Sequence, residues 1–376
     1  MFSQQSIKIH KKLNGKIEIK SKAPLKTKKD LSIFYTPGVG AVSSYLAKNK
    51  KETREMTIKN NSVAIVSDGS AVLGLGNIGP EGAIPVMEGK AMIFKEFGGV
   101  DAFPIVLNTQ DTEEIIKTIK YIEPVFGGIN LEDISAPRCF EVENRLKKIL
   151  DIPVFHDDQH GTAIVVLAGL INSFKIAKKD FKDAKIVVVG AGAAGIAITN
   201  LLLQYGVGDI VLLDSKGIIS KSRMDLNIFK KDIATKTNKE NLEGGLNEAL
   251  QIADAVVGVS APDIIKARHI QCMAKKAIVF GLSNPVPEIM PDIAKKGGAF
   301  IIATGRSDFP NQINNALVFP GIFRGALDKK VSQITDIMKI NAAKNLAALI
   351  KKPTPDKIIP SVFDKKVVKA VAAAIK

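Results

Sequence analysis

In Val187-Val188-Val189-Gly190-Ala191-Gly192-Ala193-Ala194-Gly195, an apolar run typical of a β-strand passes into glycines spaced as G-x-G-x-x-G. A helix-like apolar segment follows to about Tyr205, and a second apolar run, Ile210-Val211-Leu212-Leu213, ends in Asp214. A strand, a glycine turn, a helix and a second strand ending in an acid form the pattern of dinucleotide-binding βαβ units. The segment therefore predicts a Rossmann-type parallel sheet from about residue 185 onward.

The glycine turn is the predicted cofactor site, because its backbone lets a pyrophosphate approach the amides at a helix N-terminus. The residues predicted to contact the cofactor are Gly190, Gly192, Ala193, Ala194, Gly195, Asp214, Ser260 and Asn284. Asp214 would meet the ribose hydroxyls and so favour NAD, yet Ser215 and Lys216 follow it and can accommodate a 2′-phosphate. An ordinary glycine-rich turn is the alternative, and the choice between NAD and NADP stays open.

Two pairs of adjacent carboxylates follow apolar runs in the part of the chain before this turn. Glu132-Asp133 closes Gly128-Ile129-Asn130-Leu131, and Asp157-Asp158 closes Pro153-Val154-Phe155-His156. Helix caps and surface ion pairs are the commoner fate of such acids. Burial after apolar runs would, however, leave like charges side by side unless a cation neutralised them, and carboxylates from separate segments are usual ligands of Mg²⁺ or Mn²⁺. The pattern predicts a metal site.

The remaining pattern alternates between strand-like and helix-like segments, which predicts an α/β protein with mostly parallel strands. Strands are expected at 62–67, 103–107 and 128–131, and later at 255–259, 277–281 and 299–303. Because 376 residues exceed the usual size of one hydrophobic core, we expect two domains. These are an N-terminal α/β substrate and metal domain, 1–159, and a C-terminal Rossmann-type doubly wound sheet, 160–376.

Composition limits the other functional classes. The formal charge of +15 is carried almost wholly by lysines spread along the chain, which favours a solvated surface over specific nucleic-acid binding. The apolar run 163–171 is far shorter than a bilayer, so we expect no membrane segment. Cys139 and Cys272 are the only cysteines and form no ligand spacing, which indicates a reducing compartment, the cytoplasm.

Taken together, several motifs in the chain resemble those of the malic enzyme family, in family order over nearly the whole length. They are Tyr35-Thr36-Pro37-Gly38-Val39, Gly74-Leu75-Gly76-Asn77-Ile78-Gly79, Glu88-Gly89-Lys90, Glu132-Asp133, His156-Asp157-Asp158-Gln159-His160-Gly161-Thr162, the glycine turn, Ser283-Asn284-Pro285, and Asn314-Asn315 before Phe319-Pro320-Gly321. Because the chain has no acyltransferase-like extension, it resembles the short bacterial form. The resemblance implies metal-dependent oxidative decarboxylation of L-malate to pyruvate and CO₂, with reduction of NAD or NADP, by a homodimer or larger assembly.

The resemblance also implies roles for individual residues. Glu132, Asp133 and Asp158 would ligate Mg²⁺ or Mn²⁺, and Lys90, assisted by Asp157, would be the base on the C2 hydroxyl. A lysine needs a lowered pKa for this task, which desolvation and a nearby cation would supply. Tyr35 would protonate C3. Asn284 and Asn315 would contact the substrate, with Asn314 alongside.

One departure from the family and two rival functions remain. Larger family members carry an arginine for a malate carboxylate just before the Gly-Leu-Gly motif, where this chain reads Gly69-Ser70-Ala71-Val72-Leu73. Arg138 or Arg306 can replace it, and each can equally be a surface or structural arginine. The rival functions are a metal-independent amino-acid dehydrogenase and a non-catalytic nucleotide-sensing protein.

Overall fold

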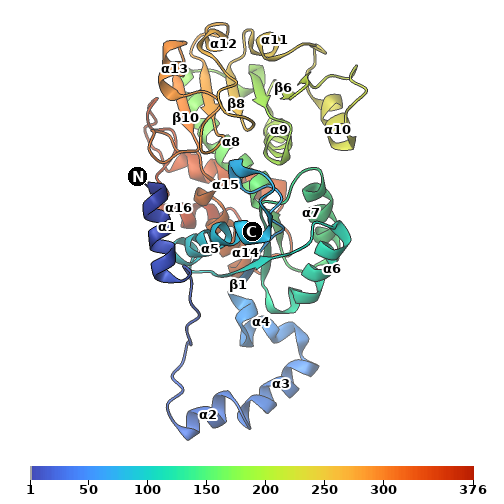
Figure 1. Ribbon diagram of the computed structural model, residues 1–376, viewed down its shortest axis with the longest axis vertical. Helices are drawn as coiled ribbons and strands as arrows, with labels where there is room; N and C mark the ends of the chain where they lie inside the picture. Colours follow the sequence, from blue (N-terminus) through green and yellow to red (C-terminus); the bar gives the residue numbers. More distant parts are fainter. Residues whose placement is uncertain (1) are drawn as a thin grey trace.

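The computed structural model describes residues 2–376 and contains two β-sheets with helices packed around them (Figure 1). The strands are β1 (Ser62–Ser67), β2 (Asp101–Val106), β3 (Gly128–Leu131), β4 (Val154–His156), β5 (Lys185–Val189), β6 (Asp209–Asp214), β7 (Gly217–Ile218), β8 (Ala255–Gly258), β9 (Ile278–Gly281) and β10 (Ile301–Thr304). The α-helices are α1 (Phe2–Leu13), α2 (Lys28–Phe34), α3 (Gly38–Lys48), α4 (Thr53–Met56), α5 (Gly79–Gly98), α6 (Thr112–Ile122), α7 (Arg138–Ile149), α8 (Asp157–Ala177), α9 (Ala193–Tyr205), α10 (Ile228–Lys236), α11 (Leu246–Leu250), α12 (Ala267–Gln271), α13 (Pro291–Lys296), α14 (Phe319–Lys329), α15 (Asp336–Ala348) and α16 (Lys366–Ala372).

The first sheet has the order β2-β1-β3-β4 with all neighbours parallel. The chain leaves β1 toward β2 and then crosses to β3 on the other side, so the strand order reverses between β1 and β3. Ligands of open parallel sheets bind at the carboxyl ends of the strands beside such a reversal. The acids after β3 and β4 lie at this edge, because Leu131 is in register with His156.

The second sheet has the order β10-β9-β8-β5-β6-β7, and only the short pair β6 and β7 is antiparallel. Its reversal lies between β5 and β8, where the glycine turn begins. The predicted α/β class, with a doubly wound Rossmann sheet in the C-terminal part, is confirmed. The antiparallel edge strand β7 was not predicted, since two residues give no periodic signal.

Helices from the end of the chain complete the core of the first sheet. The ring of Phe319 packs on Phe94 of α5 with centroids 4.7 Å apart, and Phe323 lies 5.4 Å from Phe94 and 6.0 Å from Phe155. Helices α14 and α16 pack against each other and α14 also packs on α5. The boundary expected between residues 159 and 160 falls inside α8 and stays a prediction.

Helix α8 is longer than the apolar run that we considered as a membrane candidate. Among residues 2–376 it alone has the length and composition of a bilayer span, and 72% of its apolar window is buried inside the protein. It packs against α9 and α15. The short apolar run was therefore the wrong argument against a membrane segment, because the helix itself is long enough to span a bilayer. Its burial identifies α8 as a core helix.

An arm formed by α2 and α3 projects from the body of the molecule (Figure 1). It is joined to the body by an extended segment after α1 and by α4 before β1. The arm, residues 28–48, has no buried residue in α2 or α3, and it exposes several large apolar side chains. These are Leu31, Ile33, Phe34, Tyr35, Val39, Val42 and Tyr45.

Candidate active site

Four carboxylates gather where β3 and β4 end. Oxygens of Glu132, Asp133 and Asp158 lie within 4.8 Å of one another. Asp133 adopts a left-handed backbone conformation (φ 53°), and its N–H donates to Oδ2 of Asp158 at 2.8 Å. Aspartate is one of the few residue types that tolerate this conformation. The turn thus fixes the first acidic pair against the second, as the sequence predicted for a metal site.

Lys90 lies beside this cluster although it comes from α5. The buried residues of α5, namely Ala83, Met87, Lys90, Ala91, Phe94 and Gly98, repeat with helical spacing, so the lysine shares the face that covers the sheet. Its Nζ lies 2.6 Å from Oε1 of Glu132 and forms a short contact with Asp157. The ammonium also lies 4.3 Å from the centroid of the Phe319 ring. Only 7% of the lysine side chain is exposed.

The electrostatics of the cluster follow from burial and from unequal numbers of charges. Burial and the charge of Asp158 raise the pKa of Glu132 well above its usual range, and burial raises the pKa of Asp157 to about 6. Burial opposes the ammonium form of Lys90, but the attraction of Asp157 and Glu132 outweighs it and raises the pKa of Lys90. The lowered pKa expected for this lysine is therefore absent while only carboxylates surround it.

The residues present fit a divalent cation. The carboxylates of Glu132, Asp157 and Asp158 all act on the one ammonium of Lys90, so negative charge exceeds positive charge around this lysine. Asn130 orients Glu132 by donating from Nδ2 to Oε2 at 3.0 Å. Three carboxylate groups with oxygens this close match the ligand preference of Mg²⁺ and Mn²⁺. Glu132, Asp133 and Asp158 would be the groups that hold the ion.

The glycine turn has the close packing and the open side that a dinucleotide needs. Gly190 has φ 118°, and a Cβ on Gly195 would lie 1.7 Å from the carbonyl oxygen of Gly190, so a side chain there would disrupt the turn. A Cβ on Gly192, by contrast, would meet no atom within 4 Å. Gly192 caps α9, whose N-terminus carries partial positive charge. Ser260 lies directly against Gly190.

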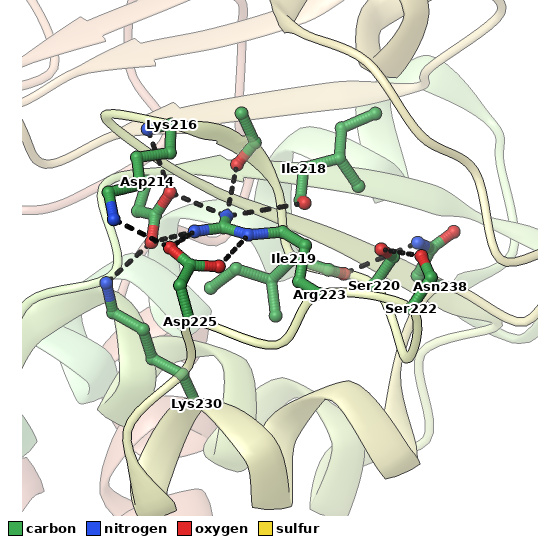
Figure 2. Close-up of polar contacts among 11 residues, drawn as sticks. Asp214, Lys216, Ile218, Ile219, Ser220, Ser222, Arg223, Asp225, Lys230 and Asn238 are labelled. Atoms are coloured by element: carbon green, nitrogen blue, oxygen red, sulfur yellow. Dashed lines mark hydrogen bonds and ion pairs between the residues drawn. The ribbon is translucent and has the colours of Figure 1, made fainter.

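Asp214 ends β6 next to this turn, since the N–H of Gly190 donates to the carbonyl of Leu213 at 2.9 Å. Figure 2 shows that Asp214 is already surrounded by donors, chiefly Arg223 and Lys230. These hydrogen bonds outweigh burial and lower the pKa of Asp214. The acid expected to meet the ribose is thus part of an ion-pair network.

The asparagines expected to contact substrate lie in loops that approach the acidic edge from the second sheet. A Cβ on Gly161 would lie 1.8 Å from Oδ1 of Asp157 and 3.2 Å from Cβ of Asn315, which places Asn315 beside the cluster. A Cβ on Gly74 would lie 1.9 Å from the carbonyl oxygen of Asn284. Asn314 instead caps the following turn by accepting from the N–H of Ala316 at 2.8 Å.

The structure does not bring Tyr35 to Lys90 within one chain. Tyr35 ends α2 on the arm, and 65% of it is exposed.

Neither Arg138 nor Arg306, the two arginines considered for binding a malate carboxylate, has its guanidinium free for that task. Arg138 donates to Asp68 at 2.6 Å and to Ser70, and Arg306 pairs with Asp308 and donates to the carbonyl of Pro285.

Two buried glutamates that hold the site were missed in the sequence. Glu143 of α7 accepts from the N–H of His156 at 3.1 Å and contacts His160, so it fixes the start of α8. Glu288 accepts from the N–H groups of Ser260 at 2.6 Å and Ser283 at 3.0 Å, which ties the loops after β8 and β9 together. Neither belongs to an acidic pair, so only their position among apolar residues could have identified them.

Known proteins with this architecture agree with the site. A family model described as malic enzyme, N-terminal domain, matches residues 14–147, and one described as malic enzyme, NAD binding domain, matches 159–376. An NAD-dependent malic enzyme of Geobacillus stearothermophilus is 55% identical over 96% of this chain and 76% of its own length. A bifunctional malic/malolactic enzyme of Bacillus subtilis is 51% identical over 99% of this chain and 92% of its own.

A crystal structure of an NAD-dependent malic enzyme from Thermotoga maritima superposes with a TM-score of 0.96 at 48% identity, covering 98% of both chains. A malic enzyme structure from Entamoeba histolytica gives the same TM-score at 39% identity, covering all of this chain and 80% of the other. The chain therefore belongs to the malic enzyme family and catalyses the oxidative decarboxylation of malate with reduction of NAD or NADP.

Proposed function

We propose that this malic enzyme converts L-malate to pyruvate and CO₂ with Mg²⁺ or Mn²⁺ held by Glu132, Asp133 and Asp158. The observation that carries the proposal is the buried contact of Lys90 with both Glu132 and Asp157 at the edge of this cluster. When bound, the cation would supply Lewis-acid polarisation of the substrate C2 oxygen. NAD or NADP, held at the glycine turn by Gly190, Gly192, Ala193, Ala194, Gly195, Ser260 and Asn284, would accept the hydride from C2.

Lys90 and Asp157 are proposed to act as a proton-sharing pair. Asp157 is in short contact with the Lys90 ammonium and, together with Glu132, raises the pKa of Lys90, so a bound divalent cation would be needed to oppose this charge and lower the pKa of Lys90 until the neutral amine is available. The amine then takes the proton of the C2 hydroxyl as hydride leaves C2. After CO₂ departs, Lys90 returns a proton to the C2 oxygen, and it takes this proton back when C3 is protonated, so that the product is the ketone pyruvate. Asn284 and Asn315, with Asn314 alongside, are proposed to orient the substrate.

Tyr35 is proposed to protonate C3 from a second copy of the chain. The arm keeps Tyr35 away from Lys90 of its own chain, yet it exposes a row of apolar side chains that a monomer would leave in water. Pairing two copies would bury this row and let each arm reach the partner's acidic edge. This arrangement supports a homodimer or a larger assembly built from such pairs.

We place the protein in the cytoplasm and assign it no nucleic-acid or membrane partner. Both cysteines are free thiols, which suits a reducing compartment. The apolar helix α8 is mostly buried in the protein core, which disfavours a role in a membrane. The lysine-based positive charge is spread over the chain and has the character of a solvated surface.

A turnover matrix tests the proposal. The full chain is assayed with L-malate, NAD or NADP, and Mg²⁺, Mn²⁺ or chelator, while reduced nicotinamide and pyruvate are measured together. We expect one pyruvate per reduced nicotinamide, and loss of turnover on chelation that added Mn²⁺ restores. Turnover that survives complete removal of divalent metal would contradict the proposed metal site, and oxidation of amino acids without metal would favour the dehydrogenase alternative.

A further inference from the structure

The carboxylate of Asp214 has its hydrogen-bonding positions filled by the protein itself (Figure 2). Oδ1 accepts from the N–H of Lys216 at 3.0 Å and from Arg223 at 2.7 Å. Oδ2 accepts from Arg223 at 3.2 Å and from Lys230 of α10 at 2.6 Å. A carboxylate offers about four acceptor positions. All of them are in use, so a ribose 2′-hydroxyl finds no free acceptor here unless a protein donor moves away.

The charges around Asp214 also remove the usual reason for excluding a 2′-phosphate. Besides Asp214, the network contains Asp225, Arg223, Lys216 and Lys230. Three positive and two negative groups leave one formal positive charge. An acid that rejects NADP does so by electrostatic repulsion, and in this network that repulsion is neutralised.

The donors in the network are not equally able to bind a new anion. Arg223 donates to Asp214, Asp225 and the carbonyl of Gly217. These hydrogen bonds hold the loop between β6 and α10 together, so the guanidinium is already engaged. Each lysine ammonium has three donors. Among the described residues, the ammonium of Lys230 pairs with Asp214 and the ammonium of Lys216 pairs with Asp225, and 68% of the Lys216 side chain is exposed. Both lysines therefore keep N–H groups for a ligand without breaking the loop.

We propose that Lys216 and Lys230 form a 2′-phosphate site at the end of β6, and that this chain binds NADP at least as readily as NAD. Asp214 acts there as the anchor that places Arg223 and Lys230, and it does not select NAD. The inference rests on the proposed binding of the cofactor at the glycine turn, next to which Asp214 lies.

Binding of NAD and NADP to the full-length protein, measured by calorimetric titration without malate or metal, tests the inference independently of turnover. For the unmodified chain we expect NADP to bind at least as tightly as NAD, and more weakly as salt is raised. In Lys230→Gln and Lys216→Gln we expect NADP to bind about tenfold more weakly, since each loses a charge-assisted hydrogen bond, while NAD changes by less than about twofold. Lys230→Arg should retain most of the NADP affinity.

Lys231→Gln is the matched control, because it removes the same charge from the next position of α10, where the side chain is exposed. It should leave both affinities nearly unchanged. Thermal melting and circular dichroism of each variant verify folding. Binding of NAD alone, or an equal loss of both cofactors in folded Lys230→Gln, would overturn the inference and leave the cofactor role of the glycine turn intact. If neither cofactor bound, that role would fall as well.

Discussion

Lys90 shows how one side chain can serve both packing and chemistry. Its alkyl chain lies on the buried face of α5, and its ammonium forms ion pairs with Glu132 and Asp157. A buried ion pair adds little net stability, but removal of one partner leaves the other charges uncompensated. The lysine is therefore needed for the tolerance of buried carboxylates as well as for the proposed proton transfer.

We predict that Lys90→Ala lowers the rate of malate oxidation by at least about 100-fold, because the base for the C2 hydroxyl is lost. Affinity for NAD and NADP should stay within about twofold, since no contact of Lys90 reaches the glycine turn. Steady-state kinetics and cofactor titration measure the two effects. Lys95→Ala is the control, because Lys95 lies on the same helix in an exposed pair with Asp101. An equal loss of turnover and of cofactor affinity would count against the role of Lys90.

Asp158→Asn should separate metal binding from folding. The substitution removes one of three negative charges within 4.8 Å, so we expect the Mn²⁺ affinity to fall by at least about tenfold. The amide oxygen can still accept from the N–H of Asp133, and like-charge repulsion decreases. The metal-free variant should therefore melt at the same or a higher temperature than the parent in chelator. A lower melting temperature with unchanged Mn²⁺ affinity would indicate a purely structural acid.

At the level of single residues, the sequence identified the acids because they come in pairs after apolar runs. Lys90 and Tyr35 were identified only by family resemblance, although the spacing of Ala83, Met87 and Phe94 already places position 90 on a buried face. Glu143 and Glu288 had no motif. Their importance comes from backbone N–H groups that only the folded chain brings to them.

Among the elements, most strands began and ended within two residues of their predicted positions, because buried parallel strands give uninterrupted apolar runs. Helix α8 was the least evident element, since it spans Asp157–Ala177 whereas the apolar run considered in the sequence covers only 163–171. Asp157 and Asp158 occupy its first turn, where the helix dipole favours acids. The acids expected at the end of an apolar run are thus also the first residues of a helix.

The loop between β6 and α10 should show a pH-dependent contribution from Asp214. The pKa of Asp214 is lowered in the folded protein, so its stabilisation is complete above its unfolded pKa of about 4 and is lost as pH falls through the folded value. Asp214→Asn should therefore destabilise the cofactor-free chain by about 1–2 kcal/mol at pH 7 and by less at pH 3. Urea unfolding at both pH values measures this difference.

Asp232→Asn is the comparison for that experiment, because Asp232 pairs with Lys236 on the exposed surface of α10. An exposed pair contributes little, so its loss should change stability only slightly at either pH. A destabilisation by Asp214→Asn that is equal at pH 7 and pH 3 would mean that shape, and not charge, holds the loop.

At the scale of the whole molecule, the arm is the feature that a single chain does not explain. Its helices contact each other but bury nothing, and Tyr35 lies at the junction between them. The sequence predicted a homodimer or larger only through family resemblance. It could not show that Tyr35 and Lys90 are kept apart in one chain, because that separation depends on the path taken by residues 14–61.

Mixing two inactive variants tests whether a partner supplies Tyr35. Tyr35→Phe and Lys90→Ala should each be nearly inactive. After subunit exchange, a mixed dimer should contain one site with both intact groups, so an equimolar mixture should recover about one quarter of the parental activity. Light scattering should show dimers for each variant. No recovery from mixtures that do exchange subunits would mean that both groups act within one chain.

The return of α14 to the first sheet has a consequence for biosynthesis. Phe319 and Phe323 pack between Phe94 and Phe155, so the layer that surrounds Lys90 is complete only when residues that follow the second sheet are available. When the strands of both sheets have left the ribosome, Phe319 and Phe323 are still inside the exit tunnel. The first half of the polypeptide should therefore stay protease-sensitive during translation until that late helix emerges from the exit tunnel.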